Sequence, residues 1–300
     1  MSTPAEKRSP TPITPNMLRK WRLPGPGNKY ERGSVLVLGG ARRTPGAAML
    51  AGISALRVGA GRLTLAVSEA VAVQLAVAVP EAGVVGLPEV GKGSVRWPGT
   101  DALSEELDAA DVVLIGPGLD SPNETRALLK RFLAEYQPGG STCLVLDAYA
   151  LGVLPDLGED LQPWGGRVIL TPNSTEASYL LGRETGDPVM DAVEIARKYG
   201  AVVASRGVVA EGDGAAAESE GPWELTTGYG GLGTSGSGDV LAGAVAGLRA
   251  RGTTEAQAAC WGSHLHASAG DRLASRKGSV GYLARELADE LPPLMMELGT

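Results

Sequence analysis

Short apolar runs alternate with longer amphipathic or alanine-rich segments along most of the chain. The short runs are typical of buried strands, and the segments between them are long enough for helices. We expect strands over residues 34–38, 62–67, 111–115, 143–146, 167–170 and 202–204, and then a hairpin region over 208–227. Strands that alternate with helices predict a mainly parallel sheet with helices on both of its faces.

The predicted helices lie between these strands and dominate the last quarter of the chain. We expect them over residues 17–23, 47–58, 69–79, 123–136, 175–181, 191–199, 239–251, 254–274 and 280–291. Proline and other turn residues dominate the first 28 residues, and no linker follows them. The pattern therefore predicts a tail over residues 1–28, partly disordered, and a single domain over residues 29–300.

Most of the predicted strands end in glycine, aspartate, asparagine or proline. The strand-end sequences are GGARR, GPGLD, LDAYA and TPNSTE. Ligands bind at the carboxyl ends of the strands in open α/β sheets, so we expect these loops to share one edge and form a site. Arg42 and Arg43 lie in the first loop, where they either face solvent or contact a diphosphate.

Residues 231–239, GLGTSGSGD, place several glycines before one carboxylate and an apolar helix. The first N–H groups of a helix have no partner inside it, and the helix dipole is positive there. Glycines let the backbone approach a phosphate closely. Asp239 could then act as a general base on a hydroxyl that attacks this phosphate. The alternative is that Asp239 only caps the helix and the glycines only form a turn.

Two other phosphate-binding patterns fit less well. Residues 86–94, GLPEVGKGS, resemble a P-loop, but Gly93 stands in place of the Ser or Thr, and Pro98 follows too soon for a helix to begin cleanly. Residues 231–236 match G-x-G-x-x-G by letter. However, no strong strand precedes them and no acidic residue ends a following strand, so a dinucleotide fingerprint is disfavoured.

Composition narrows the set of partners. The formal net charge of −7 disfavours a nucleic-acid partner, because phosphate backbones need a basic surface. No apolar run reaches the roughly 18 residues of a membrane span, and the N-terminus has no apolar secretory segment. Cys143 and Cys260 lie far apart in apolar surroundings, which fits a reducing cytoplasm. We therefore expect a cytoplasmic protein whose ligands are small molecules.

Several residues near these motifs have a structural interpretation. His264 and His266 are the only histidines, and a spacing of two on a helix turns them in different directions. No cysteine or acid completes a metal site with them, so we expect structural roles. Trp223 and Tyr229 flank the glycine loop, where we expect packing, with adenine stacking as the alternative.

The segment GTSGSGDVLAG resembles the G-x-G-D signature of ribokinase-like small-molecule kinases. A larger set of motifs, spread over residues 30–292, is similar to one branch of that superfamily, the ADP/ATP-dependent NAD(P)H-hydrate dehydratases. These motifs are GSVLVLGG, TPGAAMLAGISALRVGAGRLTLAV, VLIGPGL, LDAYAL, ILTPNSTEASYLLG, SGSGDVLAG and AACWGSHLHASAGDRLA. The resemblance implies a ribokinase-like three-layer α/β/α sandwich with a mainly parallel central sheet, forming a single catalytic domain.

The resemblance also implies a reaction: dehydration of (S)-NADH or (S)-NADPH hydrate, with ADP or ATP as phosphoryl donor and Mg²⁺ as cofactor. Asp239 would be the base, and Gly236, Ser237 and Gly238 would form the anion hole. Glu176 would act on Mg²⁺ through water. The hydrated dinucleotide would contact Ala47, Gly118, Asn173 and Asp239. The adenine nucleotide would contact Arg206, Gly207, Val208, Val209, Ala210 and Gly238.

The resemblance further implies a homo-oligomer, for which a tetramer is one form, and a separate epimerase, because no epimerase domain is recognised in this chain. The sequence departs from the family pattern at four positions, one of which, Ser237 in place of the Thr of G-T-G-D, keeps a hydroxyl. Asn173 replaces the His of TPHPGE, Tyr149 replaces the second acid of LDADAL, and Arg206 replaces a Lys. The Asn-x-x-Glu pattern at Asn173 is typical of sugar kinases. A small-molecule kinase and a non-catalytic nucleotide-binding protein therefore remain alternatives.

Overall fold

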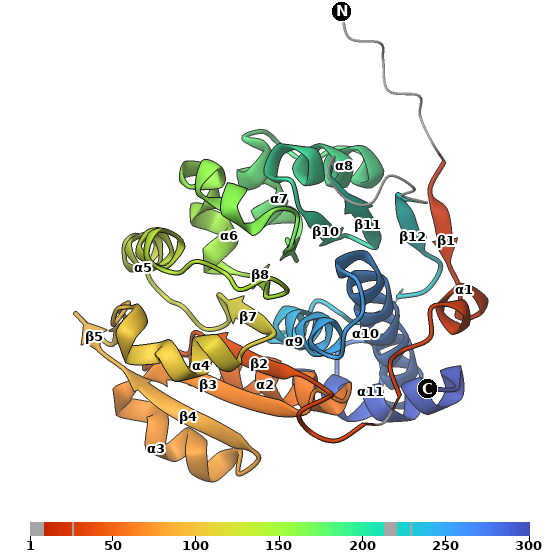
Figure 1. The fold of residues 1–300 in the computed structure, drawn as a ribbon. Helices are drawn as coiled ribbons and strands as arrows, with labels where there is room; N and C mark the ends of the chain where they lie inside the picture. Colours follow the sequence, from red (N-terminus) through yellow and green to blue (C-terminus); the bar gives the residue numbers. More distant parts are fainter. Residues whose placement is uncertain (1–8, 26, 213–220, 229) are drawn as a thin grey trace, which may run out of the picture.

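The computed structural model describes residues 9–25, 27–212, 221–228 and 230–300. The central sheet has ten strands within these residues (Figure 1). Their order is β1 (Thr11–Ile13), β12 (Trp223–Leu225), β11 (Val208–Glu211), β10 (Val202–Ser205), β9 (Val168–Leu170), β8 (Cys143–Leu146), β7 (Val112–Ile115), β2 (Ser34–Leu38), β3 (Arg62–Ser68) and β4 (Ala82–Leu87). Neighbouring strands are parallel except in the pairs β10–β11 and β11–β12. The strands β5 (Glu89–Val90) and β6 (Ser94–Val95) form a separate antiparallel pair.

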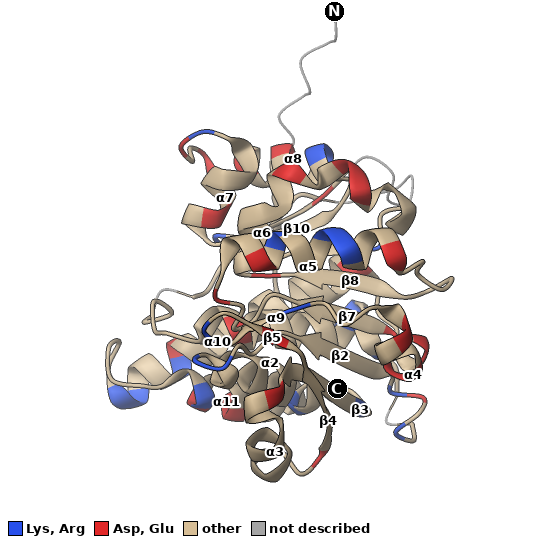
Figure 2. Ribbon diagram, turned by 90° about the vertical axis from the view of Figure 1, so that its left-hand side faces the viewer, with Lys and Arg blue, Asp and Glu red and all other residues tan. Residues whose placement is uncertain are grey.

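Alternate side chains of the strands enter two different cores. In β2, Val35 and Val37 pack on one face of the sheet, and Leu36 and Leu38 pack on the other. The inner strands β2, β7 and β8 carry no charged residue, as expected for strands that are covered on both faces (Figure 2). The predicted three-layer α/β/α sandwich with a mainly parallel sheet is confirmed.

Helices cover each face of the sheet (Figure 1). The first face carries α2 (Pro45–Arg57), α3 (Glu69–Ala78), α9 (Ser237–Ala250), α10 (Glu255–Lys277) and α11 (Ala284–Leu298). The second face carries α4 (Ser104–Ala109), α5 (Pro122–Glu135), α6 (Tyr149–Val153), α7 (Ser174–Leu181) and α8 (Pro188–Tyr199). Short 3₁₀ helices cover Thr100–Leu103, Leu154–Asp156 and Gly158–Trp164.

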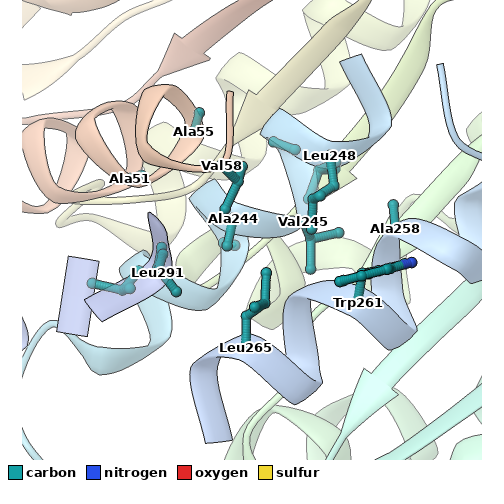
Figure 3. Close-up of a cluster of buried hydrophobic side chains, with 14 of the residues drawn as sticks. Ala51, Ala55, Val58, Ala244, Val245, Leu248, Ala258, Trp261, Leu265 and Leu291 are labelled. Atoms are coloured by element: carbon teal, nitrogen blue, oxygen red, sulfur yellow. The ribbon is translucent and has the colours of Figure 1, made fainter. Parts of the chain in front are cut away.

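Glycines bring α9 unusually close to α2. A Cβ atom added to Gly243 would lie 2.0 Å from the Ala51 carbonyl oxygen, and one added to Gly247 would lie 2.5 Å from the Ala55 oxygen. The other side of α9 packs on α10, where Val245 faces Trp261 (Figure 3). Both neighbours therefore fix α9, and with it the position of its N-terminus.

Part of the expected tail, from Thr11 onward, belongs to the folded structure. Strand β1 pairs in parallel with β12, and α1 (Pro15–Lys20) follows it. Ile13 and Leu18 are completely buried, because the core of the first face covers their apolar side chains. Residues 1–8 and 26 of the expected tail lie outside the described residues.

Other differences from the predicted elements concern ends and edges. Helix α11 continues through Pro292 and Pro293 to Leu298, beyond the expected end at residue 291. Strand β4 forms an edge that the sequence pattern did not single out. The expected hairpin is present as β11 and β12, and residues 213–220 between them lie outside the described part. Within the described ranges, no helix combines the length and apolar character of a membrane span.

Candidate active site

The loops after β2 and β7 bind each other at the carboxyl edge of the sheet. The Ala41 N–H donates to the Gly118 carbonyl at 2.8 Å, and the Thr44 hydroxyl donates to the same oxygen at 2.7 Å. Gly118 has φ +75°, and a Cβ there would lie 2.3 Å from the Thr44 oxygen and 3.2 Å from the Ala47 Cβ. Two residues predicted to hold the hydrated dinucleotide, Ala47 and Gly118, are therefore neighbours.

The two arginines of the first loop have different surroundings. The Arg42 guanidinium forms an ion pair with Glu89, and the Arg42 backbone N–H donates to the Gly93 carbonyl at 3.0 Å. Arg43 is exposed. Gly93 lies in the connection of the β5–β6 hairpin rather than before a helix, which agrees with the rejection of a P-loop.

The glycine loop ends at the N-terminus of α9. Gly236, with φ +88°, caps this helix without a side chain. The Ser237 N–H donates to the Thr234 carbonyl at 3.1 Å. The N–H groups of Gly238 and Asp239 donate to no backbone carbonyl of the described residues. These two groups lie at the positive end of the helix dipole, where N–H groups without a partner suit an anion, whereas the Ser237 N–H is already bound to Thr234.

Asp239 is half-buried in the first turn of α9, three positions after Gly236. It is therefore not the helix cap. Burial, and then the negative charge of Glu176, raise the pKa of Asp239 to about 6. A carboxylate with a pKa near the working pH can accept a proton in one step and release it afterwards, which is the requirement for a general base.

Three carboxylates from different elements meet here. Asp147 follows β8, Glu176 lies in α7 and Asp239 lies in α9. Asp147 is 5% exposed and accepts a 2.8 Å hydrogen bond from the Thr171 hydroxyl. Burial raises the pKa of Asp147 to about 8, and the charges of Glu176 and Asp239 contribute to that shift. The sequence alone predicts no role for Asp147, although its position at a strand end, in LDAYAL, was an available signal.

The fit of Mg²⁺ to this cluster depends on water. Across the described residues, no three or more His, Cys, Asp or Glu side chains are placed to hold a metal ion directly. The negative charges of Glu176 and Asp239 nevertheless raise the pKa of Asp147, and the charge of Glu176 raises that of Asp239, so a cation would relieve an unfavourable concentration of acidic groups. Mg²⁺ usually keeps several waters and binds nucleotide phosphates with one or two carboxylates, so the arrangement fits an indirect contact.

Asn173 and Glu176 form a capping box at the start of α7. The Asn173 side chain accepts hydrogen bonds from the N–H groups of Thr175 (2.9 Å) and Glu176 (3.0 Å), and Glu176 accepts one from the Asn173 N–H at 2.9 Å. The Asn-x-x-Glu pattern that pointed to sugar kinases thus has a sufficient structural explanation. Tyr149 begins α6 and is 43% exposed.

The segment predicted to bind the adenine nucleotide begins with a tight turn. Arg206 (φ 48°) and Gly207 (φ 82°) connect β10 to β11. The Arg206 guanidinium forms an ion pair with Asp191 and donates to the Gly186 carbonyl at 3.2 Å. Asp191 is 2% exposed and also pairs with Arg183 at 2.9 Å. The Asp191 carboxylate holds the Arg206 side chain in place. Its negative charge also neutralises part of the guanidinium charge that a phosphate would meet.

The three residues that follow the turn lie inside the sheet. Val208, Val209 and Ala210 belong to β11, between β10 and β12, and are at most 1% exposed. Their side chains belong to the two cores. Among the predicted nucleotide contacts in this segment, the turn residues Arg206 and Gly207 are the ones that remain half-exposed.

His266 of α10 reaches the glycine loop. Its Nε2 and the Ser237 hydroxyl share a hydrogen bond of 2.8 Å, and both residues are buried. Burial lowers the pKa of His266 to about 4, so the ring is neutral at neutral pH. His264 contacts Ser268 of its own helix. Sequence reasoning gave both histidines structural roles and did not connect His266 with the site. Trp223 packs edge-on against Trp21, and Tyr229 lies outside the described residues.

The sequence also matches a protein-family model. The model of NAD(P)H-hydrate dehydratase matches residues 35–293. The chain belongs to this family. It is 44% identical over 295 residues to the ADP-dependent (S)-NAD(P)H-hydrate dehydratase of Xanthomonas campestris pv. campestris, with 95% of this chain and 96% of that protein covered. It is 37% identical to the bifunctional NAD(P)H-hydrate repair enzyme Nnr of Moorella thermoacetica, and spans 51% of that longer protein.

Solved structures agree with the fold. The ADP/ATP-dependent NAD(P)H-hydrate dehydratase of Bacillus subtilis, co-crystallised with ATP and Mg²⁺, is similar with a TM-score of 0.74 at 24% identity, covering 97% of this chain and 99% of that one. A ribokinase-like superfamily protein of Enterococcus faecalis is similar with a TM-score of 0.77 at 25% identity, covering 96% of each chain. The ribokinase-like architecture is thus shared across these structures.

Proposed function

We propose that this dehydratase-family chain restores NADH or NADPH from the (S)-hydrate by phosphorylation with ADP or ATP and elimination of phosphate. The observation that carries the proposal is the position of Asp239. Its carboxylate, with a pKa near 6, lies in the same helical turn as the free N–H groups of Gly238 and Asp239. A base and an anion-binding position side by side are the parts that phosphoryl transfer to a hydroxyl needs.

In this proposal Asp239 takes the proton from the hydroxyl of the hydrated ring. The hydroxyl oxygen then forms a bond to the terminal phosphorus of the nucleotide, and the bond from that phosphorus to the remaining nucleotide breaks. ADP would leave as AMP, and ATP as ADP. The new phosphate ester departs as inorganic phosphate with loss of a ring proton, which restores the double bond. The N–H groups of Gly238 and Asp239 stabilise the charge on the transferring group.

The remaining assignments follow the same layout. Ala47, Gly118 and Asn173 line the dinucleotide side, and the Arg206–Gly207 turn lies on the adenine-nucleotide side. Mg²⁺, contacted through water by Glu176, would neutralise the nucleotide phosphates. The 44% identity to a relative named as ADP-dependent favours ADP as the donor. A separate epimerase that converts the other epimer to the (S)-hydrate, a homo-oligomeric state and a cytoplasmic location remain predictions.

The test is an assay with purified protein, NADH hydrate, Mg²⁺ and either ADP or ATP. Recovery of the reduced-nicotinamide absorbance, with one inorganic phosphate released per NADH formed, is expected. A stable phosphorylated product would instead indicate a small-molecule kinase. Nucleotide binding without any turnover would indicate a non-catalytic binding protein. Either of these results would overturn the proposal.

A further inference from the structure

Helix α10 holds the glycine loop at two places. The His266 Nε2 and the Ser237 hydroxyl share the 2.8 Å hydrogen bond at the end of the loop. Five residues further along the helix, the Asp271 carboxylate accepts hydrogen bonds from the N–H groups of Gly228 (2.8 Å) and Gly230 (3.0 Å). One rigid helix therefore fixes both ends of the segment that leads into the proposed anion site.

The segment between these contacts needs such anchoring. Gly231, Gly233, Gly236 and Gly238 lie within eight residues, and glycine loses more conformational freedom on ordering than any other residue. Phosphoryl transfer, in contrast, requires the base and the N–H donors to be held close to their productive positions before the reaction. A contact that fixes the end of this loop therefore affects the geometry of the reacting groups.

Ser237 is placed to transmit this anchoring. It is the first residue of α9, two positions before Asp239, and it is 4% exposed, whereas Gly238 beside it is exposed. Its N–H is bound to the Thr234 carbonyl, and its hydroxyl is bound to His266. The N–H and the hydroxyl of Ser237 thus join the helix turn to its surroundings. A neutral histidine has one donor and one acceptor, which suits a hydroxyl partner.

We propose that His266 is a positioning residue for the proposed reaction. Through Ser237 it holds the first turn of α9, so that the Asp239 carboxylate and the N–H groups of Gly238 and Asp239 face the transferring phosphoryl group. This inference rests on the proposed function and goes beyond it, because His266 does not touch the reacting atoms. Loss of the contact should therefore reduce the rate of the chemical step much more than the affinity for nucleotide.

The kinetic test compares the wild type with His266→Phe, Ser237→Ala and the double variant. His264→Phe is the matched control, because His264 lies two residues away on α10, is equally buried at 7% exposure and contacts Ser268 of the same helix. Rates are expressed per nucleotide-binding site, counted by calorimetric titration well below the unfolding temperature. This normalisation removes any loss that arises only from unfolded protein.

We expect kcat to fall about tenfold to a hundredfold in each single variant, with the nucleotide Kd changed by less than about threefold. The double variant should lose no more than the worse single variant, since both substitutions break the same contact. His264→Phe should keep kcat within about twofold of the wild type. An unchanged kcat per site in His266→Phe, or losses that simply multiply in the double variant, would overturn the inference.

Amide hydrogen exchange over residues 231–240 gives a readout that does not depend on turnover. His266→Phe and Ser237→Ala should exchange faster there than the wild type and the His264→Phe control, because the anchored turn opens more often. Equal exchange in all four proteins would overturn the inference. A wild type that binds nucleotide but restores no NADH would defeat the proposed function, and the exchange data would still decide whether His266 orders this turn.

Discussion

Glu176 and Asp239 lie in the first turns of helices on opposite faces of the sheet, and the charge of Glu176 raises the pKa of Asp239. The N-termini of α7 and α9 therefore point toward one shared space at the carboxyl edge of the strands. Asp147, at the end of β8, interacts with both acids, since the charges of Glu176 and Asp239 each raise its pKa. Parallel strand ends and helix starts bring these groups together without any sequence proximity.

Replacement of the proposed base gives the most direct functional prediction. Asp239→Asn should lower kcat by roughly 10²- to 10⁴-fold, because the amide cannot accept the hydroxyl proton. Nucleotide binding, measured by calorimetry, should persist, since the backbone N–H groups remain. Asp289→Asn is the matched control: its carboxylate forms a surface ion pair with Arg57 and is 63% exposed, so it should leave kcat unchanged. Near-normal turnover in Asp239→Asn would remove Asp239 as the base.

The pH dependence should report the same group. Because the pKa of Asp239 is about 6, kcat/KM should fall as the pH drops below about 6 and the carboxylate becomes protonated. Glu176→Gln removes a negative charge that raises this pKa, so the acidic limb of the profile should move to lower pH, whatever the height of the plateau. A limb that stays in place, or moves upward, would show that Glu176 does not act on the titrating group.

Asp147 should make stability depend on pH in the opposite sense to an ordinary surface acid. Its folded-state pKa, about 8, is higher than the value of about 3.9 expected when unfolded, so the folded protein binds the extra proton. The free energy of unfolding should therefore decrease as the pH rises from 4 to 8, by at most about 1.4 kcal/mol per pH unit from this group. Asp147→Asn keeps an oxygen for the Thr171 hydroxyl and should weaken this dependence.

Urea unfolding of the wild type and of Asp147→Asn at several pH values checks this prediction. The variant should gain on the wild type as the pH rises toward 8, and the two should converge near pH 4. A difference in stability that does not change with pH would contradict the raised pKa of Asp147.

Asp191 should show the reverse behaviour. Burial alone would raise the pKa of Asp191, but hydrogen bonds from the Gly186 N–H and from the Arg183 and Arg206 guanidiniums hold it below its ordinary value. Its contribution is therefore present above the unfolded pKa of about 3.9 and is lost as the pH falls through the folded value. Asp191→Asn should destabilise the protein by about 2 kcal/mol at pH 7 and by much less in acid. Equal destabilisation at both pH values would be inconsistent with the lowered pKa.

The sequence predicted the inner strands and the glycine loop well, because both signals are local. An apolar, uncharged run such as 34–38 indicates a strand that is covered on both faces. A dense group of glycines before an acid indicates a helix N-terminus that an anion can approach closely. The pairing of β1 with β12 could not be foreseen in this way, since a three-residue strand has little pattern of its own and its partner lies some 200 residues away. The proline pair in α11 is a similar case. Proline usually ends a helix, but burial of Leu294 and Leu298 stabilises α11 beyond Pro292 and Pro293.

Site residues divide along the same line. Asp239 is a candidate that its own loop indicates, whereas the proposed role of His266 depends on a contact with Ser237 between different helices. A buried histidine that packs and one that anchors a loop have the same sequence pattern. For Asn173 and Glu176 the local pattern has two explanations, because a pattern associated with kinase chemistry is also a complete capping box.

The close contact of α9 with α2 should make Gly243 the most sensitive glycine of this interface. A Cβ there would lie 2.0 Å from the backbone oxygen of Ala51, so Gly243→Ala must separate the two helices. We expect a destabilisation of about 3 kcal/mol or more, measured by urea unfolding, and a lower kcat per folded molecule, because α9 carries Asp239. Gly152→Ala, in α6, is the matched control: its Cβ would meet no atom within 4 Å. The control should be neutral or slightly stabilising. A Gly243→Ala protein as stable and active as the control would show that close packing on α2 does not position the N-terminus of α9.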